Sequence, residues 1–237
     1  MMSGKSWGYV VQFFCLLVFL GMSPFLIKMD GRKTMSVSSD SVRSQNVSDE
    51  VKPVAALTFD DGPNASSTPI LLDGLKERKV RATFFLIGEN VEKDENEKIV
   101  KRMYEEGHLI GNHTYTHCNL SKLETREAKK ELEQTDTVIE KITGKQPVFA
   151  RAPYGELPVD SEQDLSRIYI GWTVDPLDWM TEDAGAVVKT VVEEINPGDV
   201  ILLHDCYPSS VQAAIRIVDL LQGKGYEFVT VDHLIMD

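Results

Sequence analysis

The stretch "VAALTFDDGP", residues 54–63, is the part of the sequence from which the fold can be worked out. A run of apolar and β-branched residues leads directly into two adjacent carboxylates, Asp60 and Asp61, and then into a Gly-Pro pair. Such a run is typical of a buried strand, and Gly and Pro favour a sharp turn. The stretch therefore predicts a strand that ends in two acids and a turn. Taken by itself, it could equally be a surface turn.

Short apolar runs alternate with helical patterns along the rest of the chain. Strands are predicted at 54–59, 82–87, 108–112, 148–150, 168–174, 200–203 and 226–231. One helical stripe runs from Ala128 to Ile142 and ends at Gly144, and a second runs from Val211 to Leu221 and ends at Gly223. Alternation of strands and helices implies parallel pairing with the helices outside. The chain is therefore predicted to be α/β, with a small, incomplete barrel favoured over a sandwich.

Polar side chains follow five of the predicted strands. In chain order they are Asp60 and Asp61, then His113 and His117, then Arg151, Pro153 and Tyr154, then Asp175, Asp178 and Trp179, and finally His204 and Asp205. In a parallel α/β barrel the carboxyl ends of the strands converge on one mouth, where active sites are built. We therefore expect these side chains to share one site.

Two histidines and a carboxylate can form a three-ligand metal site with open positions. A metal there would acidify a water molecule and polarise a carbonyl group. A second carboxylate could take the water proton, and a third histidine could protonate the leaving atom. The alternative for His113 and His117 is a pair one helical turn apart on a solvated face. His108 and His233 have no comparable setting and are interpreted as structural or surface residues.

The segments "TFDDGP", "HTYTH", "RAPY", "DPLDW" and "LLH", in this order, resemble the five motifs of the polysaccharide deacetylases, the NodB-homology family of carbohydrate esterases. The resemblance extends from Val54 to about Leu234. It implies a distorted, incomplete (β/α) barrel of that family's type and metal-dependent removal of N-acetyl, less often O-acetyl, groups from sugar polymers. Ala152 departs from the pattern, which commonly has a proline there, and the helix expected before "IYIGWTV" looks truncated.

The resemblance also implies roles for individual residues. Asp61, His113 and His117 would hold the metal. Asp60 would be the general base, held by Arg151, and His204 would be the general acid, oriented by Asp178. Pro153 and the backbone N–H of Tyr154 would face the substrate and its oxyanion, and Trp179 and Leu202 would form the walls of a pocket for the acetyl methyl group. The metal would be Zn²⁺, with Co²⁺, Ni²⁺ and Mn²⁺ as alternatives. A structural ion pair is the alternative role for Arg151 and for Asp178, and core packing for Trp179.

Charge and the N-terminal segment bear on partners and location. The formal charge of −12 over 237 residues argues against nucleic acid as the main partner. The uncharged run Trp7–Ile27 is long enough to cross a bilayer, so residues 1–33 are predicted to be a signal anchor, with a cleaved signal peptide as the alternative. The Ser-rich segment 34–53 is predicted to be a flexible linker, and 54–237 the catalytic domain. We therefore expect an exported protein, either membrane-anchored with an extracellular catalytic domain or secreted. The sequence leaves the oligomeric state open, with a monomer favoured.

These features favour an enzyme that removes N-acetyl groups from N-acetylglucosamine-type residues of a cell-wall or chitin-like polysaccharide. Peptidoglycan is favoured because wall glycan is the polymer nearest to an exported protein. The alternatives are an O-acetyl esterase acting on xylan or another acetylated polysaccharide, and an inactive carbohydrate-binding protein. Cys118 and Cys206 follow two of the motifs and could pair, although two separate small buried residues are favoured over a disulfide.

Overall fold

The computed structural model describes residues 52–93, 95–157 and 167–236. The predicted signal anchor, nearly all of the predicted linker and the segment in which a truncated helix is predicted lie outside these residues. Those predictions and the domain boundaries therefore stay predictions. Within the described ranges, no helix combines the length and the apolar character that a bilayer crossing requires.

Among the described residues, seven strands form one sheet in which every pair is parallel. They are β1 (Val54–Gly62), β2 (Thr83–Leu86), β3 (Leu109–Asn112), β4 (Phe149–Ala150), β5 (Ile168–Tyr169), β6 (Val200–His204) and β7 (Glu227–Val229). Their order is β5-β4-β3-β2-β1-β6, and β7 also pairs with β1. The parallel α/β arrangement predicted from the sequence is confirmed.

Strand β1 pairs with three others, although it lies next to the β6 edge of the sheet. Ala56 is in register with Val200 of β6 and with Val229 of β7, so these two strands lie on opposite sides of β1. Thr58 is likewise in register with both β6 and β2. Strands β7 and β2 therefore share one side of β1, with β7 along its first half and β2 along its second.

The segment 168–174, predicted to be one strand, is regular only at its two ends. Its first residues form β5 beside β4, and Val174 then forms an isolated bridge to Ile201 of β6. Between these contacts, the carbonyl oxygens of Ile170 and Gly171 accept hydrogen bonds from the Arg151 side chain, at 3.1 and 2.9 Å, instead of from a strand. One segment thus spans the gap between the sheet edges, which makes the barrel distorted and incomplete, as the sequence predicts.

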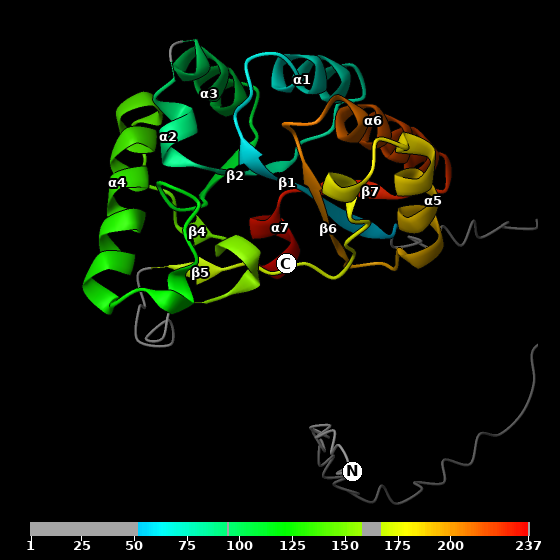
Figure 1. Cartoon of the computed structure of the whole chain (residues 1–237). Coiled ribbons are helices and arrows are strands. Elements are labelled where there is room, and N and C mark those ends of the chain that lie inside the picture. The colour runs from blue at the N-terminus through cyan, green and yellow to red at the C-terminus, as the bar shows by residue number, and fades with distance from the viewer. Residues whose placement is uncertain (1–51, 94, 158–166, 237) are drawn as a thin grey trace, which may run out of the picture. The chain divides into compact units, whose positions relative to one another are not determined.

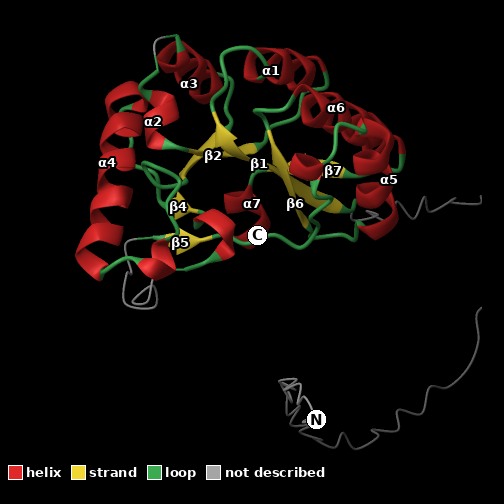
Figure 2. Ribbon diagram, in the orientation of Figure 1, coloured by secondary structure: helices red, strands yellow, loops and turns green. Residues whose placement is uncertain are grey.

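Helices surround the strands. They are α1 (Thr68–Glu77), α2 (Gly88–Val91), α3 (Asn96–Glu105), α4 (Thr125–Thr143), α5 (Ala184–Glu194), α6 (Pro208–Gly223) and α7 (Val231–Met236). Figures 1 and 2 show α1, α3, α4, α5 and α6 on the outside of the sheet. The predicted stop of α4 is confirmed, because Gly144 caps it with a φ of 73°. Helix α6 instead includes Gly223 as its last residue.

The last predicted strand is shorter than expected, because β7 ends at Val229 and Val231 already begins α7. Val231 is fully buried in a small cluster with Ala56, Phe85 and Phe149. Leu57 belongs instead to the large cluster between sheet and helices. Alternate residues of β1 therefore face outward and inward, and the apolar part of the barrel interior is closed by the start of α7.

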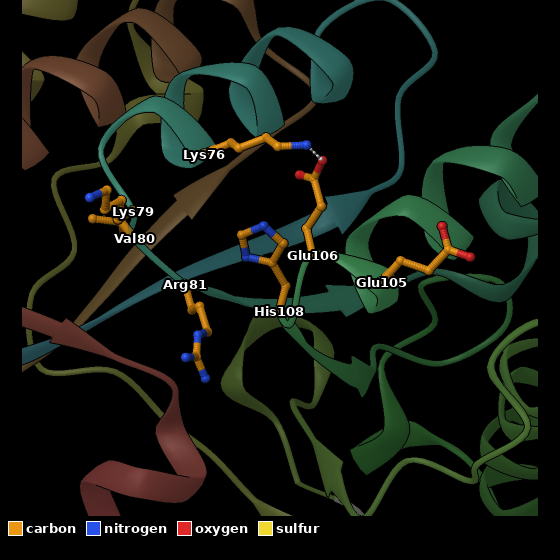
Figure 3. Close-up of a pocket in the computed structure, with 7 residues that line it drawn as sticks. All are labelled: Lys76, Lys79, Val80, Arg81, Glu105, Glu106 and His108. Atoms are coloured by element: carbon orange, nitrogen blue, oxygen red, sulfur yellow. Dashed lines mark hydrogen bonds and ion pairs between the residues drawn. The ribbon is translucent and has the colours of Figure 1, made fainter.

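A surface pocket lies at the amino-terminal ends of β2 and β3, and Figure 3 shows the residues that line it. Lys76 and Glu106 form an ion pair across it, at 2.9 Å. His108 forms part of the lining but is itself 5% exposed, and its Nδ1 accepts a hydrogen bond from the backbone N–H of Ala82. His108 is thus the structural histidine that the sequence suggests.

The buried state of His108 predicts a specific loss of stability in acid. Burial lowers the pKa of His108 from 6.5 to about 4, with the charges of Arg102 and Arg81 acting in the same direction and Glu106 opposing them. Between these pH values the unfolded chain binds a proton that the folded protein does not, so stability falls as the pH falls through this window.

We expect the free energy of unfolding to drop by about 2 kcal/mol more between pH 7 and pH 5 in the wild type than in His108→Asn. The asparagine keeps an acceptor near Ala82 but does not titrate. Chemical denaturation at the two pH values measures the difference. Parallel pH profiles for the two proteins would contradict it.

Candidate active site

The irregular end of β1 brings two neighbouring carboxylates to one mouth. A regular strand would send Asp60 and Asp61 to opposite faces. Here the register with β2 shifts between Phe59 and Gly62, and Asp61 adopts a φ of 69°. The Asn90 side chain donates a hydrogen bond of 2.7 Å to the carbonyl oxygen of Asp61 and holds this left-handed backbone. The two acids can therefore serve the same site.

Asp61 meets two histidines that come from the loop after β3. The Nε2 atoms of His113 and His117 lie 3.4 and 3.2 Å from Oδ1 of Asp61. One ligand atom from each of these three residues lies within 4.8 Å of the others. Nδ1 of His113 is 2.7 Å from the carbonyl oxygen of Arg151, which can only accept, so Nδ1 carries the proton and Nε2 presents its lone pair.

The donor set fits a divalent transition metal. Oδ1 of Asp61 is buried and has no hydrogen-bond partner among the described residues. Burial by itself would raise the pKa of Asp61, but the close approach of His113, together with the positive charge that His113, His117 and His204 carry when protonated, holds this pKa below its ordinary value. Burial lowers the pKa of His117. An ionised carboxylate and neutral imidazoles are the forms that bind such a metal.

Asp60 lies beside this cluster and is held by Arg151. The guanidinium NH1 donates to Oδ1 of Asp60 and to Oγ1 of Thr58, both at 2.8 Å. Oδ2 of Asp60 faces the other way, 3.7 Å from Nε2 of His113. Arg151 is 1% exposed, and its guanidinium carbon lies 4.3 Å from the centre of the Phe85 ring. One oxygen of Asp60 is thus anchored and the other faces the proposed ligands.

His204 enters the site from the end of β6. Both oxygens of the buried Asp178 bind it, one at Nδ1 and one at the backbone N–H, each at 2.8 Å. Its Nε2 lies 4.0 Å from Oδ2 of Asp61. Burial would lower the pKa of His204, but the hydrogen bond and charge of Asp178 raise it above the ordinary value. His204 is therefore set up to carry a proton toward the cluster.

Of the residues predicted to contact substrate, Tyr154 and Trp179 are exposed, at 66% and 52%, whereas Pro153 and Leu202 are buried. Tyr154 has a φ of 62°, and its ring lies 4.9 Å from the ring of His117. The structure thus places Tyr154 beside His117. Trp179 follows Asp178 at the start of the same short helical turn, residues 178–180.

A family model described as polysaccharide deacetylase matches residues 48–170. The chain belongs to the polysaccharide deacetylase family. A Bacillus cereus protein named peptidoglycan-N-acetylglucosamine deacetylase is 42% identical over 192 residues, which cover 77% of this chain and 68% of that protein. The Bacillus subtilis peptidoglycan-N-acetylmuramic acid deacetylase PdaC is 38% identical over 194 residues, which cover 82% of this chain but 41% of PdaC. The family resemblance seen in the sequence is confirmed.

Solved structures agree with the fold of this polysaccharide deacetylase. PdaC superposes with a TM-score of 0.74 at 38% identity and covers 78% of this chain and 90% of that one. A family 4 acetyl xylan esterase from Clostridium thermocellum, solved in complex with a cobalt ion, gives 0.73 at 33% identity, over 77% of this chain and 90% of that one. Two acetyl-removing enzymes with different named substrates thus share the incomplete barrel.

Both cysteines of this polysaccharide deacetylase that lie in the described residues are free thiols, as favoured from the sequence. They are half-buried, so the expectation that both are buried is wrong. Cys206 lines a pocket that also contains Asp61, and burial raises the pKa of its thiol to about 12. A thiol with such a pKa is a poor nucleophile.

Sequence reasoning missed several polar residues that support the site. Thr58 could have been found, because it lies two residues before Asp60 on the inward face of β1. Asn90 has no sequence signal, since it comes from the short helix α2. Asp175, left without a role, accepts a hydrogen bond from Leu177, which has a φ of 53°, and so shapes the turn before Asp178.

Asp205, to which the sequence also assigns no role, lies against Gly62, which directly follows Asp60 and Asp61. It is fully buried, its Oδ2 accepts a hydrogen bond from Thr68, and its backbone oxygen accepts one from Ser67. A Cβ atom on Gly62 would lie 2.5 Å from Oδ1 of Asp205. The absence of a side chain at Gly62 therefore lets the turn that carries both acids rest on Asp205.

We expect Gly62→Ala to lower the free energy of unfolding by about 1–3 kcal/mol, because the new methyl group overlaps a buried, hydrogen-bonded carboxyl group. Gly223→Ala is the control, since a Cβ atom there has no neighbour within 4 Å, and it should be neutral or slightly stabilising. Urea denaturation of the three proteins compares them. Equal stability of Gly62→Ala and the wild type would show that the Asp205 side chain moves aside freely.

Proposed function

We propose that this polysaccharide deacetylase removes N-acetyl groups from N-acetylglucosamine residues of peptidoglycan by metal-dependent hydrolysis. The observation that carries the proposal is the single cluster formed by Asp61, His113 and His117, with Asp60 on one side and His204 on the other. The names of the Bacillus relatives support peptidoglycan as the polymer.

Asp61, His113 and His117 would hold a divalent metal ion, Zn²⁺ first and Co²⁺, Ni²⁺ or Mn²⁺ otherwise. Such an ion, when bound, acidifies water and polarises the acetyl carbonyl group. The free oxygen of Asp60 would take the proton from the attacking water, while Arg151 fixes the orientation of this carboxylate. Asp60 would thus be the general base.

His204 would act as the general acid and donate a proton. Its Nε2 would protonate the leaving nitrogen, and Asp178 would stabilise the charged imidazolium through Nδ1. The exposed backbone turn at Tyr154, with Pro153, would place an N–H donor at the oxyanion. Trp179 and Leu202 would border the acetyl methyl group. The order of events is proton removal by Asp60 first and proton donation by His204 last.

An O-acetyl esterase is the second candidate, because the acetyl xylan esterase from Clostridium thermocellum has the same fold. The third possibility, an inactive carbohydrate-binding protein, is disfavoured because the chain keeps every polar residue that the proposed mechanism uses. We also propose that residues 1–33 are a signal anchor, or a cleaved signal, that residues 34–53 link it to the catalytic domain, and that the protein acts outside the cell as a monomer.

A substrate panel separates these candidates. We expect peptidoglycan fragments to lose the mass of one acetyl group per modified sugar. The rate of acetyl release should be highest on peptidoglycan fragments, lower on chitin oligomers and lowest on acetylxylan, because the relatives act on wall glycan. Mass spectrometry of the products identifies the sugar, and a chelator followed by added Zn²⁺ should abolish and restore activity. Activity that persists after complete metal removal would contradict the proposed chemistry, and preferred release from acetylxylan would favour the esterase.

Asp60→Asn tests the base. We expect kcat to fall by about 100- to 10,000-fold, because an amide cannot accept the water proton, while the metal content stays that of the wild type. Asp219→Asn is the control, since Asp219 forms a surface ion pair with Arg78, at 2.6 Å, and neither residue belongs to the proposed site. It should retain wild-type kcat. Full activity of Asp60→Asn would remove Asp60 from the mechanism.

A further inference from the structure

The loop that carries both proposed histidine ligands has an unfavourable backbone. Residues 113–117 leave the end of β3 and contain two non-glycine residues in the left-handed region, Thr114 with a φ of 65° and His117 with a φ of 58°. The left-handed region is disfavoured for residues with a Cβ atom, and more so for a β-branched residue such as Thr114. Contacts outside the loop must therefore stabilise this conformation.

One carboxylate oxygen accepts three hydrogen bonds from the middle of this loop. Oε2 of Glu131, in α4, accepts from the backbone N–H of Tyr115 at 3.0 Å, from the backbone N–H of Thr116 at 2.8 Å and from the Thr116 hydroxyl at 3.1 Å. Hydrogen bonds to an ionised acceptor are stronger than those between neutral groups. Glu131 therefore binds the loop at two consecutive peptide groups, between the two histidines.

Neutral contacts hold the same loop from other sides. The backbone N–H groups of Gly88 and Glu89, at the start of α2, donate to the carbonyl oxygens of Thr114 and Tyr115, at 3.0 and 2.9 Å. The Asn112 side chain accepts from the backbone N–H of Thr114, at 2.8 Å. These contacts satisfy the carbonyl groups and the start of the loop, whereas Glu131 satisfies the N–H groups at its centre.

We propose that Glu131 is a positioning residue for the metal centre, whose carboxylate holds residues 113–117 in the conformation that turns Nε2 of both histidines toward Asp61. The proposal rests on the proposed function in one respect, namely that this cluster binds a metal. Glu131 does not itself supply a ligand atom to the cluster. Its effect reaches the metal through the distance between His113 and His117 and through the rigidity of the loop between them.

Glu131→Gln and Glu131→Ala test the proposal, with Glu133→Gln as the matched control on the same helix. Glu133 is exposed and pairs with Lys129, at 3.6 Å. Calorimetry with Zn²⁺ on metal-free protein should give an affinity about 10- to 100-fold weaker for Glu131→Ala, as expected when a residue that orients ligands is lost. Glu131→Gln keeps an acceptor oxygen and should lose less, and Glu133→Gln should bind as the wild type does.

Hydrogen exchange of the metal-free proteins provides a readout that needs neither metal nor turnover. We expect the amides of Tyr115 and Thr116 to exchange at least about tenfold faster in both Glu131 variants, because they lose charge-assisted hydrogen bonds. Exchange in β1 and α6 should stay as in the wild type. Unchanged Zn²⁺ affinity together with unchanged exchange at Tyr115 and Thr116 would overturn the proposal.

Two further outcomes are decisive. If exchange accelerates throughout the barrel in both Glu131 variants, Glu131 supports the whole fold and the positioning role is wrong. If the wild type binds Zn²⁺ but releases acetate from none of the glycans, the proposed function fails. A weakened Zn²⁺ affinity in Glu131→Ala would then still support the positioning role.

Discussion

The barrel and the site both depend on the hydrogen bonds made by the buried guanidinium of Arg151. An unpaired charge in a protein interior costs several kcal/mol, so a side chain that is 1% exposed must be fully paired. Its partners are Asp60, Thr58 and the carbonyl oxygens of Ile170 and Gly171. These partners come from β1 and from the segment that spans the gap in the sheet. The charge that fixes the proposed base thus also stabilises the irregular part of the barrel.

Arg151 links the base to the proposed metal ligands through its backbone as well. Its side chain holds one oxygen of Asp60, and its carbonyl oxygen fixes the ring of His113. A change in the position of this residue would move both groups together. Phe85 lies against the guanidinium and belongs to the small buried apolar cluster that also contains Val231, so the interior on that side is apolar. The polar groups of the site therefore open toward the mouth of the barrel.

The sequence predicts the regular part of the structure well because that part follows from short-range patterns. Apolar runs locate the strands, and parallel pairing brings Asp61, His113 and His204 to one edge, whatever the details of the loops. The break within 168–174 could not be predicted, because it depends on the Arg151 side chain, which follows β4. This side chain donates hydrogen bonds to carbonyl groups that would otherwise bond to a neighbouring strand. The supporting residues Asn90 and Glu131 could not be predicted for the same reason, because each forms a hydrogen bond to a backbone group of a site loop that comes close only in the folded chain.

The distribution of backbone strain shows how the fold supports chemistry. Six described residues other than glycine have a positive φ, and five of them belong to the site loops: Asp61, Thr114, His117, Tyr154 and Leu177. Such conformations persist only where the surroundings impose them. Asn90 binds the carbonyl of Asp61, Glu131 binds the peptides beside Thr114, and Asp175 binds the N–H of Leu177. Polar contacts from outside the proposed reacting groups thus stabilise the backbone that aims them. Because regular strands would direct adjacent side chains apart, the site needs these turns, and the helices around the barrel supply most of the groups that hold them.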